Sequence, residues 1–271
     1  RRAADLFNGE TDAAFGDSIF RAVLADRDDF KSRDGVTEKT PEGTGNYNQF
    51  WLIDRWFDNR TSLIIDPPDG RMPLLSPEGQ ARIDAERAER STRGPSNSPD
   101  TYKDLSQWTR CISRGWNGIG SWYSSNYQIF QSAGYVVVFQ ELIHEARIIP
   151  LDGRPHVASD VRQWLGDARG RWDGDTLVVE TTRFSDQQVF RGLSLETARL
   201  IERFTLVDPD TLRYEVTFED PVNLRRPWTA MLAMPRTEGP MFEYACHEGN
   251  YGMTGILEIA RGEGTPRADS R

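Results

Sequence analysis

The sequence predicts a mainly β fold, in which an antiparallel meander closes into a lipocalin-like barrel behind helical N-terminal segments. The first observation is a pair of turn sequences that predict β-hairpins: Asp173-Gly174 and Asp208-Pro209-Asp210 each lie between strand-like flanks. Next, apolar and polar residues alternate from Leu212 to Phe218, as in a strand with one buried face. Last, no helical pattern interrupts the hairpins after about residue 126, which indicates successive antiparallel pairing.

The individual elements follow from local patterns. Apolar residues at helical spacing predict a helix within 12–30, and the turn signal Pro-Pro-Asp-Gly divides 60–75 into two short extended pieces. Ser76 and Pro77 are a typical cap and first turn for a charged helix over 76–90. The β-branched stretch 135–151 predicts two strands or one bent strand. Further strands are expected at 169–184, 198–220, 227–235 and 241–246.

These elements suggest three regions. We expect residues 1–110 to be helical and irregular and to pack on the barrel, residues 111–258 to form the antiparallel barrel, and residues 259–271 to be a flexible tail.

Composition excludes several classes of function. The net charge of −9 argues against a nucleic-acid partner, which needs a positive surface. No apolar run approaches the roughly 18 residues of a membrane span. The chain also lacks a nucleophile elbow, a phosphate-binding loop and a His-Glu-x-x-His motif. A small-molecule substrate or ligand is the partner that remains.

The two cysteines, Cys111 and Cys246, belong to no Cys-x-x-Cys pair, so a thiolate zinc site of the usual kind is excluded. Cysteine arithmetic leaves two alternatives: one disulfide in an exported protein, or two buried thiols.

The three histidines are the main candidates for chemistry. In an extended 142–148, His144 shares an otherwise apolar face with Leu142, Ala146 and Ile148, and is therefore expected to point inward. His156 follows a turn and is expected on the opposite face, which counts against a metal pair with His144.

His247 precedes Glu248 at an expected strand end, where a barrel mouth would place a site. Carboxylates from elsewhere in the chain are the expected partners of the imidazoles. The candidates are Glu141, Asp167, Asp175 and Glu180.

Aromatic and polar residues that could line a ligand site are abundant. The stretch WNGIGSWYSSNY is the clearest case, because its rings must cover either one end of the barrel or an apolar ligand. The expected ligand-binding set is Trp116, Trp122, Tyr123, Asn126, Tyr127, Glu141, Trp164, Trp172 and Glu180.

Five blocks between residues 46 and 258 together resemble a widespread bacterial family of mostly uncharacterised proteins. The blocks are RTSLIIDPPDGRMPLL, GYVVVFQELIHEARIIPLDGRPH, VRQWLGDARGRWDGDTLVVETTRF, RPWTA and EYACHEGNYG. Members usually carry an export signal, so the resemblance implies a periplasmic or extracellular protein and favours a Cys111–Cys246 disulfide. The chain departs from the family pattern in RGWNGIGSWYSSNYQ and RFSDQQVFRG.

The family pattern includes all three histidines, and this favours a functional site. The matching positions are His144, Arg147, Asp152, Arg154, His156, Trp164, Asp167, Arg169, Trp172, Glu180, His247, Glu248 and Asn250.

The leading hypothesis is an exported β-barrel enzyme that uses acid/base catalysis, without a cofactor, on a small apolar or aromatic molecule, as a lyase, isomerase or cyclase. His144 and His247 would exchange protons, with Glu248 or Asp167 orienting one imidazole. Arg147 or Arg169 would stabilise an oxyanion.

Two alternatives stay open. One is a hydrolase or lyase with one divalent transition metal on His144, His156 and His247. The other is a non-catalytic protein that binds a hydrophobic ligand.

Overall fold

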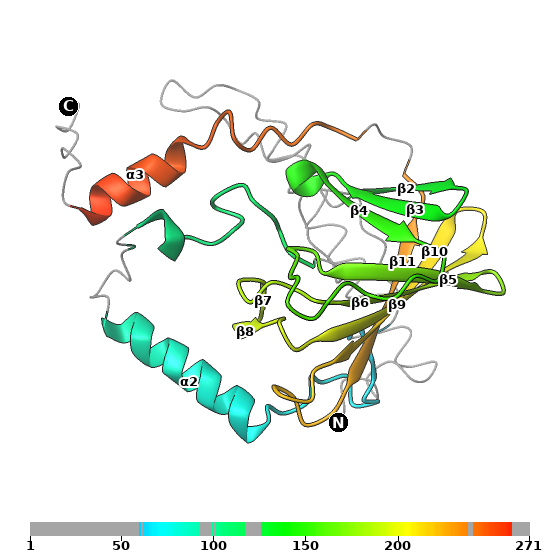
Figure 1. Ribbon diagram of the computed structural model, residues 1–271, viewed down its shortest axis with the longest axis horizontal. Helices are drawn as coiled ribbons and strands as arrows, with labels where there is room; N and C mark the ends of the chain where they lie inside the picture. The colour runs from blue at the N-terminus through cyan, green and yellow to red at the C-terminus, as the bar shows by residue number, and fades with distance from the viewer. Residues whose placement is uncertain are drawn as a thin grey trace, which may run out of the picture.

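The computed structural model describes residues 60, 62–92, 99, 101–116, 126–237 and 241–261. Its largest unit is a six-stranded antiparallel sheet with the order β1-β11-β10-β9-β6-β5 (Figure 1). These strands are β1 (Ile64–Asp66), β5 (Asp167–Asp173), β6 (Thr176–Thr182), β9 (Arg199–Asp208), β10 (Thr211–Glu219) and β11 (Trp228–Pro235).

A second, three-stranded antiparallel sheet lies over the β5 side of the first, and its strand β4 packs against β5 (Figure 1). It consists of β2 (Tyr127–Ser132), β3 (Tyr135–Gln140) and β4 (Glu145–Pro150). A small hairpin adds β7 (Val189–Phe190) and β8 (Leu193–Ser194). The expected mainly β, antiparallel fold is confirmed, but the described strands form separate sheets and no closed barrel is found.

The core lies between the two sheets. Alternate residues of β10, from Tyr214 to Phe218, are buried together with Val179 of β6 and Leu200 of β9. The three-stranded sheet contributes Val136 and Ile149 to the same core. The alternation expected along β10 is thereby confirmed, because its apolar face is the one that the second sheet covers.

The expected hairpins are also present. In β5–β6, Asp173 pairs with Thr176, so Gly174 and Asp175 form the loop, and Gly174 has a φ of +58° that suits glycine. In β9–β10, Asp208 pairs with Thr211. The stretch 135–151 divides into two strands, β3 and β4, joined by a turn that contains the 3₁₀ segment η4 (Leu142–His144).

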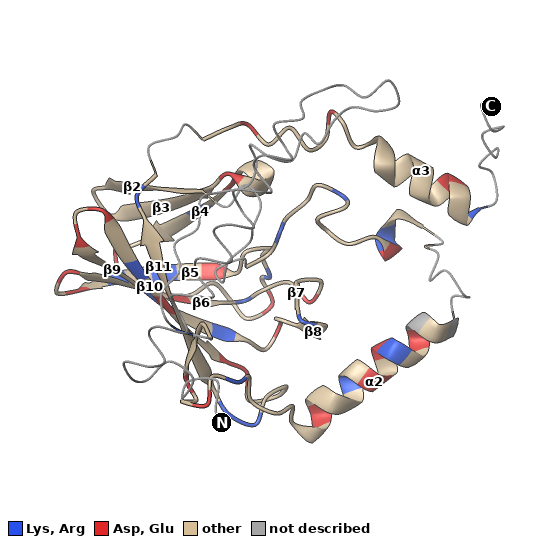
Figure 2. Ribbon diagram, turned by 180° about the vertical axis from the view of Figure 1, so that it is seen from behind, with Lys and Arg blue, Asp and Glu red and all other residues tan. Residues whose placement is uncertain are grey.

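Helix α2 (Pro77–Thr92) begins where the sequence predicts. The Ser76 hydroxyl accepts the Gly79 amide at 2.9 Å, as a helix cap should. Acidic and basic residues are interspersed along α2 (Figure 2), and Arg82 pairs with Glu78 one turn earlier at 2.8 Å. A short 3₁₀ segment, η3 (Tyr102–Asp104), follows.

The C-terminal part of the described chain differs from the expectation. Residues 241–246 form no strand, because the Phe242 amide donates to the Glu141 carboxylate and the Cys246 amide to the Tyr244 carbonyl, instead of to a neighbouring strand. Residues 251–260, most of which we assigned to the barrel, form the helix α3 (Tyr251–Ala260). The helix expected within 12–30 lies outside the described residues.

Cys111 and Cys246 form a disulfide. The disulfide connects the segment before β2 to the segment before α3. The side-chain amide of Asn250 adds to this connection by donating to the Thr109 carbonyl at 2.7 Å. None of the described helices combines the length and the apolar character needed to cross a membrane.

Gly170 lets β4 pack closely on β5. A Cβ at this position would lie 2.7 Å from Cγ2 of Ile149 and 2.6 Å from Cδ2 of Leu151. Ile149 is completely buried and cannot move away. We therefore expect Gly170→Ala to lower the free energy of unfolding by about 1–3 kcal/mol, measured by urea denaturation.

Gly249→Ala is the matched control, because a Cβ there meets nothing within 4 Å. Equal stability of the two variants would show that β4 does not depend on this close contact.

Candidate functional site

The inward face expected for 142–148 is confirmed at Leu142, which is 1% exposed, but is wrong at His144, Ala146 and Ile148. Ile143 and His144 have φ angles of 61° and 57° in a turn, and β4 begins only at Glu145. His144 is exposed, with its ring edge-on against Phe139 at 4.7 Å between centroids. Ile148, expected inside, is 63% exposed. The turn changes the strand phase after Leu142, so that Glu145, Arg147 and Ile149 are the inward residues of β4.

The pairing of β3 with β4 shows which set this is. Buried Val136 pairs with Ile149, buried Val138 with Arg147, and buried Gln140 with Glu145. The interior face of β4 therefore carries one glutamate and one arginine. With Tyr127 of β2, Glu202 of β9 and Tyr214 of β10, they form what we call the interior cluster: Tyr127, Glu145, Arg147, Glu202 and Tyr214.

An ion pair between the two sheets is the centre of this cluster. Arg147 donates from both terminal nitrogens to Glu202, at 2.9 Å and 2.6 Å. The Glu202 side chain is only 1% exposed, and it also accepts the Tyr214 hydroxyl at 2.8 Å. Burial alone would lower the pKa of Arg147, but the Glu202 carboxylate outweighs it and the pKa is raised. Arg147 is therefore fully charged.

Glu145 has a different environment. It accepts hydrogen bonds from the Ser113 side chain and the Arg114 backbone, yet burial outweighs them and raises the pKa of its carboxyl. Tyr127, in the same row of the sheet as Gln140, has its pKa raised by burial, and it feels the charges of Arg147, Glu202 and Glu145. The interior cluster thus contains one fixed ion pair and one carboxyl whose pKa is raised by burial.

Three buried polar atoms at this end of the sheet have no hydrogen-bond partner among the described residues. They are Nε2 of Gln140, Oε2 of Glu145 and Nε of Arg147. Because an unpaired buried polar atom is costly, such atoms often mark a place where a water or a ligand group binds.

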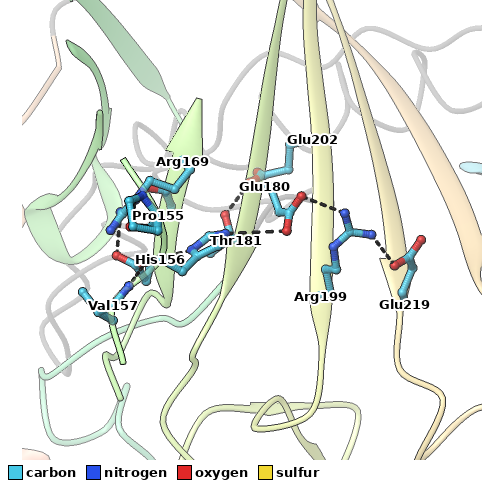
Figure 3. Close-up of polar contacts among 11 residues, drawn as sticks. Pro155, His156, Val157, Arg169, Glu180, Thr181, Arg199, Glu202 and Glu219 are labelled. Carbon is cyan, nitrogen blue, oxygen red and sulfur yellow. Dashed lines mark hydrogen bonds and ion pairs between the residues drawn. The ribbon is translucent and has the colours of Figure 1, made fainter. Parts of the chain in front are cut away.

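A second polar arrangement, which we call the outer-face network, consists of His156, Asp167, Arg169, Glu180, Arg199 and Glu219 (Figure 3). The strand pairing places it on the face of the six-stranded sheet opposite Glu202. Asp167 lies at its centre, 2.7 Å from Nδ1 of His156. It also accepts the Val157 amide at 3.1 Å and an Arg169 nitrogen at 2.6 Å. The Arg169 Nε donates to the Pro155 carbonyl at 3.1 Å. Together these contacts hold the segment 155–157 against β5.

The network continues across the sheet. Nε2 of His156 lies 3.6 Å from Glu180, which pairs with Arg199 at 2.7 Å, and Arg199 pairs with Glu219 at 2.7 Å. The hydrogen bond from Arg199 lowers the pKa of Glu180. Both nitrogens of His156 face carboxylates, so the arrangement suits a structural connection better than proton transfer to a substrate.

The expected roles of other residues change accordingly. Asp167 contacts the imidazole of His156, and not that of His144 or His247 as expected. His247 and Glu248 are exposed in the turn after Cys246. Trp164 and Trp172 are also exposed.

Several expected ligand-binding residues have structural partners. Trp116 is buried in the core against Phe190 and Phe218, at 5.5 Å and 6.0 Å between ring centroids. Asn126 donates to buried Glu141 at 2.8 Å, and this carboxylate also accepts the Phe242 amide. Trp122 and Tyr123 lie outside the described residues.

The three histidines are in different parts of the fold: the η4 turn, the segment before β5 and the turn before α3. Within the described ranges, no group of three or more His, Cys, Asp or Glu side chains is placed to hold a metal ion.

Sequence reasoning missed Gln140, Glu145, Glu202 and Tyr214 as site residues. A signal for Glu202 exists in β9, where it lies between Leu200 and Phe204 in an inward, otherwise apolar phase. A charged residue at such a position requires a buried partner. Comparisons of the chain with protein-family models, with curated proteins and with solved structures find no match.

The outer-face network predicts a stability effect. Asp167 is 6% exposed and accepts bonds from three groups, whereas asparagine offers one oxygen and places an N–H against a donor. We expect Asp167→Asn to lower the free energy of unfolding by about 1–3 kcal/mol in urea denaturation. Asp173→Asn, at an exposed ion pair with Arg203, should change it by less than about 1 kcal/mol. Similar losses in both variants would contradict the structural role of Asp167.

Glu145 predicts a pH effect of known sign. Because its folded pKa is raised, the folded protein binds more protons than the unfolded chain above the ordinary glutamate pKa of 4.5. The free energy of unfolding should therefore fall as the pH rises from 4.5 through the raised pKa of Glu145. Glu145→Gln keeps an oxygen for Ser113 and Arg114 and removes the buried charge. We expect the variant to gain stability relative to wild type as the pH rises above 4.5, measured by urea denaturation. A constant difference between the two proteins would argue against a raised pKa.

Proposed function

We propose that this protein is an acid/base enzyme of the lyase or isomerase type, which acts on a small, largely apolar molecule at the interior cluster. Glu145 would move the proton, and Arg147 would stabilise negative charge that develops on the substrate. The observation that carries the proposal is the unpaired Oε2 of Glu145, a buried carboxylate oxygen two residues from a charged arginine whose side chain is 15% exposed.

A carboxyl group suits this task when its environment brings its pKa closer to neutrality, since the acid and base forms are then both accessible. Burial acts on Glu145 in this direction. Its hydrogen bonds from Ser113 and Arg114 would hold one oxygen in place and leave the other for the substrate. The catalytic role first expected for His144 is transferred to Glu145, because His144 is exposed.

Arg147 would be positioned in advance of the reaction. Its two terminal nitrogens are occupied by Glu202, and Tyr214 in turn fixes Glu202, so the guanidinium cannot turn freely. A donor that is already oriented loses little entropy when charge develops on the substrate. The unpaired Nε is the atom through which it would act.

The interior cluster lies between two antiparallel sheets, and lipocalin-like proteins likewise bind small ligands on the inward side of their strands. The Cys111–Cys246 disulfide is of the kind that persists in exported proteins. Both points support the proposal of an exported small-molecule enzyme. A non-catalytic binder is the second candidate, and it is favoured by the buried, mutually paired charges of Arg147 and Glu202, which would suit a rigid recognition surface.

A neutral aromatic probe tests the acid/base role. In 5-nitrobenzisoxazole, a base takes the ring C–H proton, the C–H electrons form the nitrile, and the N–O bond breaks to release a phenoxide. We expect the purified protein to accelerate this reaction, followed by phenoxide absorbance, and Glu145→Gln to reduce the rate at least about a hundredfold.

Glu215→Gln, on the opposite face of β10, should leave the rate unchanged. Loss of the rate in His144→Gln but not in Glu145→Gln would refute the assignment. Binding of the probe without turnover would favour the second candidate.

A further inference from the structure

We infer that the interior cluster recognises an uncharged carbonyl compound, such as a ketone, ester or amide with an apolar body, and holds its oxygen between Gln140 and Arg147. This inference rests on the proposed function, since it names the substrate class of the same site.

Two unpaired donors carry the inference. Gln140 is only 8% exposed, and its Nε2 has no partner among the described residues. Nε of Arg147 is likewise buried and unpaired. Both groups are hydrogen-bond donors, so an acceptor atom is the ligand feature that would satisfy them. A carbonyl oxygen has two lone pairs and accepts from two donors at once.

The register places both donors around Glu145. Gln140 is the direct cross-strand partner of Glu145, where side chains leave the sheet about 5 Å apart. Arg147 is two residues further along β4, on the same face and about 7 Å away. A carbonyl oxygen bound by the two donors would therefore have its neighbouring carbon atoms within reach of the Glu145 carboxylate.

The charge balance selects a neutral ligand. The positive charge of Arg147 is matched by buried Glu202, and Glu145 adds either no charge or one negative charge. The cluster therefore has no net positive charge for a carboxylate or phosphate, which would have to lose its hydration without compensation. Buried Val138, the cross-strand partner of Arg147, offers an apolar surface beside the donors.

The implied chemistry is complete without an oxidant or a further reactant. The Glu145 carboxylate takes a proton from the carbon next to the carbonyl, and the C–H electrons form a carbon–carbon double bond. The carbonyl π electrons move to the oxygen, where Arg147 and Gln140 donate to the resulting enolate. Return of the proton to a different carbon of an unsaturated substrate completes an isomerisation.

Binding of matched probes tests the substrate class by isothermal titration calorimetry. The probes are 2-tetralone, a neutral aromatic ketone; tetralin, the same skeleton without oxygen; and 2-naphthoate, an aromatic anion. We expect 2-tetralone to bind at least about tenfold more tightly than either of the others, which corresponds to one well-made hydrogen bond.

Gln140→Leu keeps the size of the side chain and removes its donor. We expect it to weaken 2-tetralone binding by about tenfold and to leave tetralin binding unchanged. Gln128→Leu, at an exposed position of β2, is the matched control and should bind all three probes as wild type does.

Preferred binding of 2-naphthoate, absence of 2-tetralone binding, or equal affinity in Gln140→Leu would overturn the inference. A second measurement distinguishes failure of this inference from failure of the proposed function: the rate at which the α-protons of bound 2-tetralone exchange with deuterated solvent. If the ketone binds through Gln140 but Glu145→Gln leaves the exchange rate unaltered, the substrate class stands and the catalytic role of Glu145 fails.

Discussion

The ion pair between Arg147 and Glu202 connects the two sheets of this protein and constrains everything around it. Two charges can be buried only when each is matched and hydrogen-bonded, and here the guanidinium meets both carboxylate oxygens while Tyr214 supplies a further donor. Removing one partner from such a pair typically costs about 3–5 kcal/mol. The pair also determines the phase of β4, since Arg147 must point inward, and Glu145 and Ile149 must then do the same.

Two further connections keep the region around this pair in place. The outer-face network joins the segment 155–157, which follows β4, to β5 and β6. The disulfide and Asn250 join the segment that contains Ser113 to the C-terminal part of the chain. His156 and the two cysteines, which first suggest chemistry in this sequence, therefore serve to hold backbone segments, whereas His144 and His247 are exposed in turns. The groups available for chemistry are a glutamate, a glutamine and an arginine on β3 and β4.

The predictable parts of the fold are those determined by residues within a few positions of one another in the sequence. Gly174 and Asp208-Pro209-Asp210 form turns because of their own backbone preferences, and Ser76 caps α2 through a bond to a residue three positions later. The alternation along β10 survives because its pairing with β9 is regular from Leu212 to Glu219, beyond the irregularity next to the turn. The failures have non-local causes: 241–246 is held by Glu141 and by the disulfide at Cys246, and neither partner can be identified from the segment itself.

Sequence alone therefore determined the antiparallel β character, the hairpins, the start of α2 and the two cysteines that could pair. It also named Asp167 among several carboxylates that could contact an imidazole. Only the tertiary structure decided which imidazole that is, which face of β4 is interior, and which polar groups meet between the sheets. The physical reason is that a strand's period of two makes its faces equivalent until something breaks the symmetry. In β4 the inward face is determined by the left-handed backbone at Ile143 and His144 and by the ion pair of Arg147 with Glu202, a residue of β9 that lies 55 positions further along the chain.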